Sequence, residues 1–152
     1  MIRRDDKTLN LFDWTPPKIV KRFDDQRVRA VELRDLISRG VAETLRNCEL
    51  PRAEIAEKMS SWLGEDVSAN MLDQYASPAK DEHVIPLHRA LALIHVTGDD
   101  VRLLQLMAEM FAHAVIESRY VHAVHEAILT EQMETLARER KHHRKGWKGS
   151  VS

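Results

Sequence analysis

The stretch "VSANMLDQY", residues 67–75, decides what kind of fold this chain has. Gly64 precedes it and Pro78 follows it, and both residue types commonly end helices. Ser68 is a favourable N-cap, so the sequence predicts a short helix over 69–75. Helical spacing turns Met71, Leu72 and Tyr75 toward a core and leaves a slim polar outer face made of Ala69, Asn70, Asp73 and Gln74.

The segment before this helix completes the order of a helix-turn-helix. Pro51 suits the N-terminal edge of a helix that runs to about Leu63 and lines one face with Ile55, Ala56 and Met59. A slim polar second helix is what enters the major groove of DNA, where Asn and Gln pair with adenine and Asp accepts from cytosine. We therefore predict that DNA bases are read by Ser68, Ala69, Asn70, Asp73 and Gln74.

The charge around this unit favours an alternative, a structural helix pair or a protein-docking surface. Residues 51–100 carry four basic and nine acidic side chains, against eleven and nine in residues 1–50 and eight and six in residues 101–152. DNA phosphates attract cations, and few are present here. The interval from Met59 to Ser68 also exceeds the usual turn of about 3–4 residues unless the first helix of the pair extends to Leu63.

Positive charge is concentrated at the C-terminus instead. Residues 138–148, "RERKHHRKGWK", contain six basic side chains and one acidic one. Such a run attracts phosphates and Trp147 could stack on a base, but a solvated helix end whose cations oppose the helix dipole explains it equally well. The expected phosphate contacts are Arg52, Lys58, Lys80, Arg140, Lys141, Arg144, Lys145 and Lys148.

Residues 101–145 are nearly free of Gly and Pro and predict one long helix, with a change of pattern near residues 118–120 that indicates a kink, a loop or a short extended stretch. Asp99 and Asp100 suit its N-terminus electrostatically. A narrow apolar seam follows the change of pattern. Either homodimerisation or docking on the chain's own core explains it, and in the first case the interface residues are Val121, Val124, Ile128, Leu129, Met133 and Leu136.

The expected architecture is all-α: a bundle containing a helix-turn-helix, followed by a long C-terminal helix and preceded by an extended arm. In sequence order we expect the arm over 1–24, the helix-turn-helix domain over 25–100, the long helix over 101–145 and a flexible basic tail end over 146–152. Two more helices belong to the bundle. An amphipathic helix spans about 25–46, with Val28 and Val31 on its apolar face, and a short helix after Pro86 is apolar enough to be buried on most sides.

Composition restricts the function classes. Five Gly and five Pro with 43% apolar and 31% charged residues favour a helix-rich protein over a sheet sandwich or a disordered chain. The single Cys48 fits a reducing compartment, and the absence of a long apolar run predicts a cytoplasmic protein. His122 and His125 lie one turn apart but lack an obvious third metal ligand, and no nucleophile or phosphate-loop motif is present. We expect no enzyme activity, no metal and no cofactor.

Four segments together resemble small helix-turn-helix proteins of Mu-like transposable phages and prophages: "LFDWTPP" at 11–17, "RAEIAEKMSSWLGEDVSANMLDQYAS" at 52–77, "IPLHRALALIHVTGD" at 85–99, and the long charged helix that ends the chain. The resemblance implies regulation of phage DNA or a role accessory to transposition, with Ser68, Asn70, Asp73 and Gln74 as reading residues. The expected partners are double-stranded DNA and a second copy of the chain. The alternative is a noncatalytic interaction module whose helix pair and long helix dock a phage or host protein.

Overall fold

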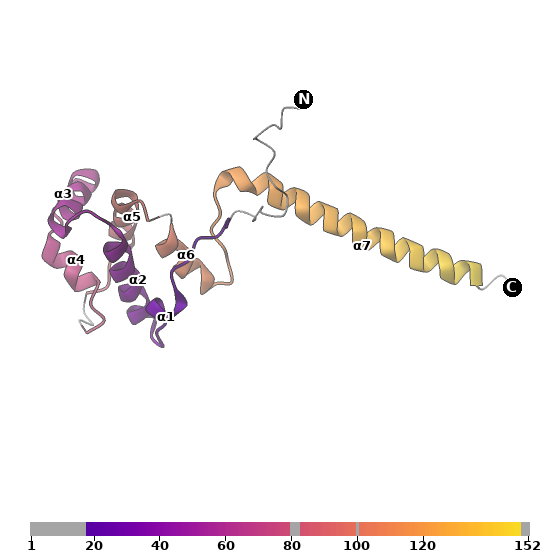
Figure 1. Ribbon diagram of the computed structural model, residues 1–152, viewed down its shortest axis with the longest axis horizontal. Helices are drawn as coiled ribbons and strands as arrows, with labels where there is room; N and C mark the ends of the chain where they lie inside the picture. Colours follow the sequence, from indigo (N-terminus) through magenta and orange to yellow (C-terminus); the bar gives the residue numbers. More distant parts are fainter. Residues whose placement is uncertain (1–17, 80–82, 100, 150–152) are drawn as a thin grey trace, which may run out of the picture. The chain divides into compact units, whose positions relative to one another are not determined.

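The computed structural model describes residues 18–79, 83–99 and 101–149, and all secondary structure in these ranges is helical. The predicted all-α class is therefore confirmed. The chain divides into two compact units, one up to Val115 and the other from Ile116 onward, each of which is described by itself (Figure 1). The first unit contains α1 (Asp25–Val28), α2 (Leu33–Asn47), α3 (Arg52–Leu63), α4 (Ala69–Tyr75), α5 (Leu87–Thr97) and α6 (Arg102–Glu109). The second contains the 3-10 helix η1 (Ser118–Tyr120) and α7 (Val121–Gly149).

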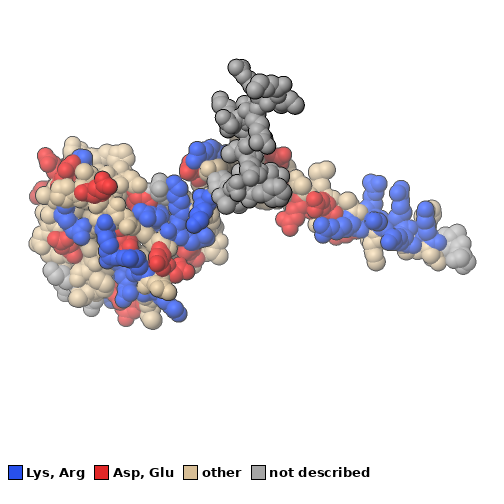
Figure 2. Space-filling view, viewed as in Figure 1, with Lys and Arg blue, Asp and Glu red and all other residues tan. Residues whose placement is uncertain are grey.

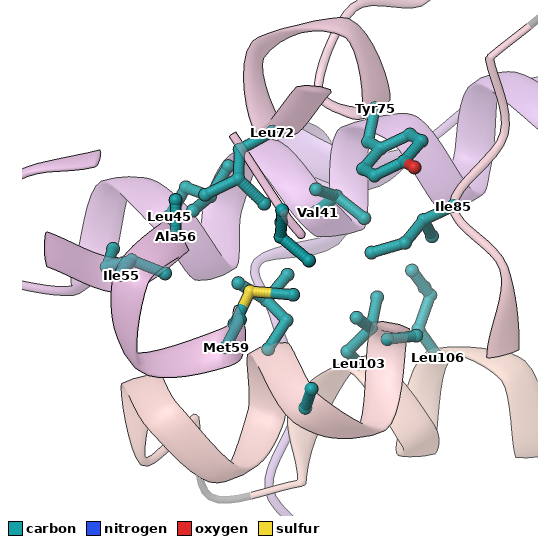
Figure 3. Packing of buried hydrophobic residues seen from close by; sticks show 14 of the residues in the cluster. Val41, Leu45, Ile55, Ala56, Met59, Leu72, Tyr75, Ile85, Leu103 and Leu106 are labelled. Atoms are coloured by element: carbon teal, nitrogen blue, oxygen red, sulfur yellow. The ribbon is translucent and has the colours of Figure 1, made fainter. Parts of the chain in front are cut away.

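Helix α2 is central to the first unit. It packs against α1, α4, α5 and α6, while α3 packs against α4 and α5. Apolar residues from all six helices of this unit meet in one core, because each helix has an apolar side to bury. Figure 3 shows this core, whose labelled members are Val41, Leu45, Ile55, Ala56, Met59, Leu72, Tyr75, Ile85, Leu103 and Leu106.

A glycine sets the distance between α2 and α6. A Cβ atom on Gly40 would lie 2.7 Å from Leu106 Cδ2 and 2.8 Å from Leu103 Cδ1, closer than packed carbon atoms approach. Glycine weakens the middle of a helix by propensity alone. Here its lack of a side chain allows the leucines of α6 to fill the space above α2.

The helix predicted over 25–46 is wrong as a single element. It is divided by extended backbone at Arg29, where φ is −57° and ψ is 122°, and Asp24 caps the short α1 by accepting the Gln26 N–H at 3.0 Å. Val28 is buried, whereas Val31, expected on the same face, is fully exposed. The break brings Val28 into the core without Val31, which an uninterrupted helix would place one turn further along the same stripe.

The helix predicted over 101–145 is also wrong as a single element. Helix α6 ends at Glu109, and Ala112 adopts a left-handed conformation with φ of 56°. The buried carboxamide of Gln105 then accepts the Val115 N–H at 2.6 Å, which holds the chain in a non-helical path between α6 and η1. The pattern change expected near 118–120 corresponds to η1.

The ends of the predicted elements differ in two further places. Residues 146–149, expected in a flexible tail end, belong to α7, because a single glycine costs only about 1 kcal/mol relative to alanine and does not by itself end a helix. Of the predicted arm over 1–24, residues 18–24 form no helix, and residues 1–17 lie outside the described part of the chain, as do residues 150–152 of the tail. Helix α5 is less buried than predicted, since Leu87 and Leu91 are exposed.

Asp99 begins α6 in the manner expected for a carboxylate at a helix N-terminus. Its Oδ2 accepts the Leu103 N–H at 3.0 Å, and its Oδ1 lies 3.0 Å from Nη2 of Arg102. Burial raises the pKa of this carboxyl, because the charged form loses its hydration, while the Leu103 N–H and Arg102 act in the opposite direction. Asp100, expected beside it in this role, is outside the described residues.

Candidate nucleic-acid interface

Helices α3 and α4 form the predicted helix pair, joined by residues 64–68. Helix α3 ends at Gly64, which adopts a left-handed φ of 71° and donates its N–H to the Ser60 carbonyl at 2.9 Å. Helix α4 begins after Ser68, whose hydroxyl accepts the Met71 N–H at 3.2 Å. The predicted N-cap and the bounds of both helices are confirmed. The connection is longer than the usual turn of a helix-turn-helix.

Ser60 ties this connection together, a role that sequence reasoning missed. Its hydroxyl accepts the Val67 N–H at 2.9 Å and lies 2.8 Å from the Ala56 carbonyl oxygen. Val67 is buried beside it. A serine in the last turn of a helix often bonds to the carbonyl four residues before it. This tendency is the only sequence feature that could have indicated the role of Ser60.

The five predicted base-reading residues lie around the N-terminus and outer face of α4. Ser68, Asn70 and Asp73 are exposed, Ala69 and Gln74 are half-buried, and the core is reached from the opposite side of the helix. The polarity of the helix is therefore as expected from its spacing. No contact with DNA follows from exposure alone.

Two of the three cations expected beside α4 are already paired. Arg52 Nε lies 2.7 Å from Oδ1 of Asp73, so an expected phosphate contact and an expected base-reading residue bind each other across α3 and α4. Lys58 Nζ lies 2.9 Å from Oε1 of Glu54, one turn earlier on α3. Lys80, the third cation expected here, lies outside the described residues. The helix pair thus presents little unpaired positive charge.

Arg89 of α5 holds α4 and its connection in place. Its Nε lies 2.7 Å from Glu65 Oε1 and its Nη1 lies 2.6 Å from the Tyr75 hydroxyl oxygen. His88 Nε2 also lies 3.0 Å from the Glu65 carboxylate. The hydrogen bond from Arg89, followed by that from His88, lowers the pKa of Glu65. Nothing in the residue pattern singles out Arg89, because Glu65 and Tyr75 are brought to it only by the packing of the helices.

Helix α7 divides by charge along its length. Its residues 121–136 include Glu126, Glu131 and Glu134 and contain no Lys or Arg, whereas residues 137–149 contain six basic side chains and one acidic one. Figure 2 shows this change from acidic to basic along the helix. Of the basic residues, Arg138 pairs with Glu134 at 3.3 Å.

The other five cations of α7 are those predicted to contact phosphates. All are exposed, and none is held in an ion pair within the described part of the chain. Four of them recur at intervals of three and four residues and so lie on one face of the helix; we call this the basic face, and it consists of Lys141, Arg144, Lys145 and Lys148. The three- and four-residue intervals between these cations can be read from the sequence, and they place the cations on one face once the segment is taken to be a helix.

The six residues predicted as a dimer interface fall on two faces of α7. Val121 and Val124 are half-buried and share a face with Ile128. Leu129, Met133 and Leu136 lie roughly a third of a turn away, and 59%, 71% and 64% of their surfaces are exposed. The seam that looked continuous in sequence is thus two patches, of which the second is open.

The first unit also exposes residues that sequence reasoning did not assign. Arg29 and Arg39 are exposed and add positive charge to its surface. Figure 2 shows Lys and Arg side chains on this unit. On the α3 and α5 side, the rings of Trp62 and His95 stack with centroids 5.0 Å apart.

His122 and His125 lie near the start of α7. The described residues contain no group of three His, Cys, Asp or Glu side chains that would hold a metal ion. Within the same residues no helix is both long and apolar enough to cross a membrane.

Comparison with known proteins finds no matching family model, no similar curated protein and no similar solved structure.

Proposed function

We propose that this chain is a noncatalytic protein that binds double-stranded DNA, holding phosphates with the basic face of α7 and reading bases with α4. The observation that carries the proposal is the basic face itself, where four exposed cations lie on one side of a helix. A role in phage or prophage DNA regulation, or one accessory to transposition, rests on the resemblance of the four quoted segments to proteins of Mu-like elements.

The spacing of the basic face suits a duplex. Lys141 and Lys148 are separated by roughly 10 Å along the helix axis, and B-DNA carries one negative charge per roughly 1.7 Å of its axis. Several phosphates are therefore within reach of the four side chains at once. Acidic residues are absent from positions 140–149, so no carboxylate weakens this attraction locally.

Within this proposal α4 supplies sequence preference and little affinity. Asn70 is exposed and its carboxamide matches the donor and acceptor of adenine in the major groove. Asp73 reads a base only after Arg52 releases it, because the two are in direct contact. We therefore assign base reading first to Asn70, with Gln74 beside it.

A salt titration tests the phosphate contacts. If four cations are neutralised by DNA, the slope of log affinity against log salt concentration is about −3.6. The variant Lys141→Gln/Lys145→Gln then shows a slope shallower by about 2, because two contacts are lost. The matched control Arg29→Gln/Arg39→Gln removes the same charge from the first unit and leaves the slope unchanged. Equal slopes for both variants would refute phosphate binding by α7.

A second candidate function is docking of another protein, and a specific observation favours it. Trp62 stacks on His95 while remaining 52% exposed, and Leu91 and Leu87 continue the exposed stripe of α5 at four-residue intervals. Exposed aromatic and aliphatic groups in a row are typical of interaction surfaces. If the wild-type chain binds no duplex even at low salt, this function replaces the first.

A further inference from the structure

One line of side chains along α7 has a strict alternation of four- and three-residue steps. Helix α7 has 29 residues and none of them is buried. Steps of four and three residues keep side chains on one seam of a helix that supercoils with another. Starting from the apolar patch that is open, this seam comprises His122, Glu126, Leu129, Met133, Leu136, Arg140, His143 and Trp147. We call it the α7 seam.

The centre of the α7 seam is apolar and its two flanks carry opposite charge. Leu129, Met133 and Leu136 are exposed to solvent by more than half of their surfaces, so no residue in the described part of the chain buries them. Glu126 precedes them by one step and Arg140 follows them by one step. A partner must therefore offer apolar side chains at its centre and the reverse order of charges.

A second copy of α7 meets both requirements in one orientation only. In a parallel pair each seam residue faces its own counterpart, so Glu126 faces Glu126 and Arg140 faces Arg140, and both contacts are repulsive. In an antiparallel pair the acidic flank of one helix lies along the basic flank of the other. The order of charges thus selects the antiparallel arrangement.

We propose that α7 pairs antiparallel with α7 of a second copy, with the two-fold axis between Met133 and Leu136. In this register Met133 packs on Leu136 of the second copy, and Leu129 packs on the alkyl stem of its Arg140. Glu126 faces His143 of the second copy and lies one layer, roughly 5 Å, from its Arg140. The axis falls near the middle of Val121–Gly149, so nearly the whole helix is overlapped.

The pairing leaves the phosphate contacts available. Lys141, Lys145 and Lys148 lie off the α7 seam, toward the far side of the helix, and only Arg144 flanks it. The inference uses the same helix as the proposed DNA contacts but does not require DNA. It is therefore tested on the protein alone, and its failure would leave the salt titration unaffected.

Charge reversal followed by sedimentation of the full chain tests the orientation. Glu126→Arg and Arg140→Glu each place like charges together in the antiparallel pair, and each weakens dimerisation by at least about tenfold. The double variant Glu126→Arg/Arg140→Glu restores attraction and recovers the wild-type dissociation constant. Glu131→Arg is the matched control, because residue 131 lies on the opposite side of α7, and it changes the dissociation constant little.

The absence of rescue in the double variant would overturn the antiparallel pairing, since a parallel pair replaces one repulsion by another in every variant. A wild-type chain that sediments as a monomer at all concentrations would overturn it as well. In that case the α7 seam is covered by another segment or partner.

Distances between spin labels provide a second, independent readout. In a Cys48→Ser background, a label attached at Lys145→Cys lies roughly 30 Å along the axis from its counterpart in the antiparallel register, because 21 residues of rise separate them. A label at Glu131→Cys is displaced from its counterpart by only roughly 10 Å along the axis. Lys145 labels no farther apart than the width of a helix pair, roughly 20 Å, would show a parallel dimer and refute the proposal.

Discussion

Helices α4 and α7 are both proposed to contact DNA, yet they are stabilised in opposite ways. Helix α4 has seven residues, and it depends on burial of Leu72 and Tyr75, on its Ser68 cap and on the bond from Arg89. An isolated helix of this length is unstable in water. Helix α7 has 29 residues, buries none of them and relies on its own backbone bonds and side-chain spacing.

The two helices therefore offer different properties to a partner: α4 has a surface whose shape is fixed by the core, and α7 has exposed charge. Substitutions in α4 alter a surface fixed by the core, so they affect folding and recognition together unless they are confined to its outer face. Substitutions in α7 alter charge or pairing and leave the first unit intact. The predictions below use this contrast, and all of them except the acid titration match a change in the first unit with one in α7.

Truncation of a buried leucine gives the largest expected effect. Leu72→Ala removes a fully buried side chain of α4 and lowers the free energy of unfolding of the first unit by about 2–5 kcal/mol. Leu136→Ala removes a side chain that is 64% exposed and changes the stability of the first unit by less than about 0.5 kcal/mol. Urea unfolding followed by tryptophan fluorescence and circular dichroism measures both. Similar losses in the two variants would contradict the contrast.

Adding one methyl group to a glycine has a smaller effect, with opposite sign in the two regions. Gly40→Ala forces Leu103 and Leu106 to move and destabilises the first unit by about 1–3 kcal/mol. Gly146→Ala meets no neighbouring atom and strengthens α7 by about 0.5–1 kcal/mol. Thermal unfolding and helical ellipticity report the two changes. A Gly40→Ala variant as stable as the wild type would show that the ends of Leu103 and Leu106 move aside at little cost.

Acidification gives the smallest effect. The pKa of Glu109 is lowered by its hydrogen bonds, first from Gln105 and then from Arg22, and that of Glu65 is lowered by Arg89. A carboxyl whose pKa is lower in the folded state stabilises the fold above its unfolded value of about 4.5, and this contribution is lost as the pH falls through the folded value. Asp99 acts oppositely, because burial raises its pKa.

We expect the Glu65→Gln/Glu109→Gln variant to lose less stability than the wild type between neutral pH and pH values below 4.5. Denaturant titrations at a series of pH values provide the measurement. Parallel stability curves for the two proteins would contradict the pKa shifts described for these carboxyls. The Asp99→Asn variant serves as the control, since removal of a carboxyl with a raised pKa makes the acid loss steeper.

Local signals allowed part of this molecule to be predicted. Pro51 and Gly64 mark helix ends through their backbone conformations and Ser68 through its hydroxyl, and the two helices they bound were predicted within a residue or so. Hydrophobic periodicity failed to predict the helix boundaries that tertiary contacts determine. The division of the first helix depends on where Val28 is buried, and the end of α6 depends on the bond between Gln105 and Val115.

The candidate interface shows the same limit. The cations of α7 lie at positions that helical spacing alone predicts, because they are exposed and no other described element buries them. Around α4, sequence spacing gave the outward residues but not their partners. Asp73 pairs with Arg52, which lies 21 positions away, and Arg89 bonds to Glu65 in the connection. Both contacts arise from helix packing, which hydrophobic periodicity does not predict.

The proposed separation of base reading from phosphate binding is tested most directly by one ratio, the affinity for the preferred genomic fragment divided by that for a random duplex of equal length. At fixed salt, Asn70→Ala/Gln74→Ala lowers this ratio by about tenfold or more while affinity for the random duplex is retained. Lys141→Gln/Lys145→Gln weakens both duplexes alike and keeps the ratio. If the lysine variant lowers the ratio and the α4 variant does not, the assignment of reading to α4 and holding to α7 is contradicted.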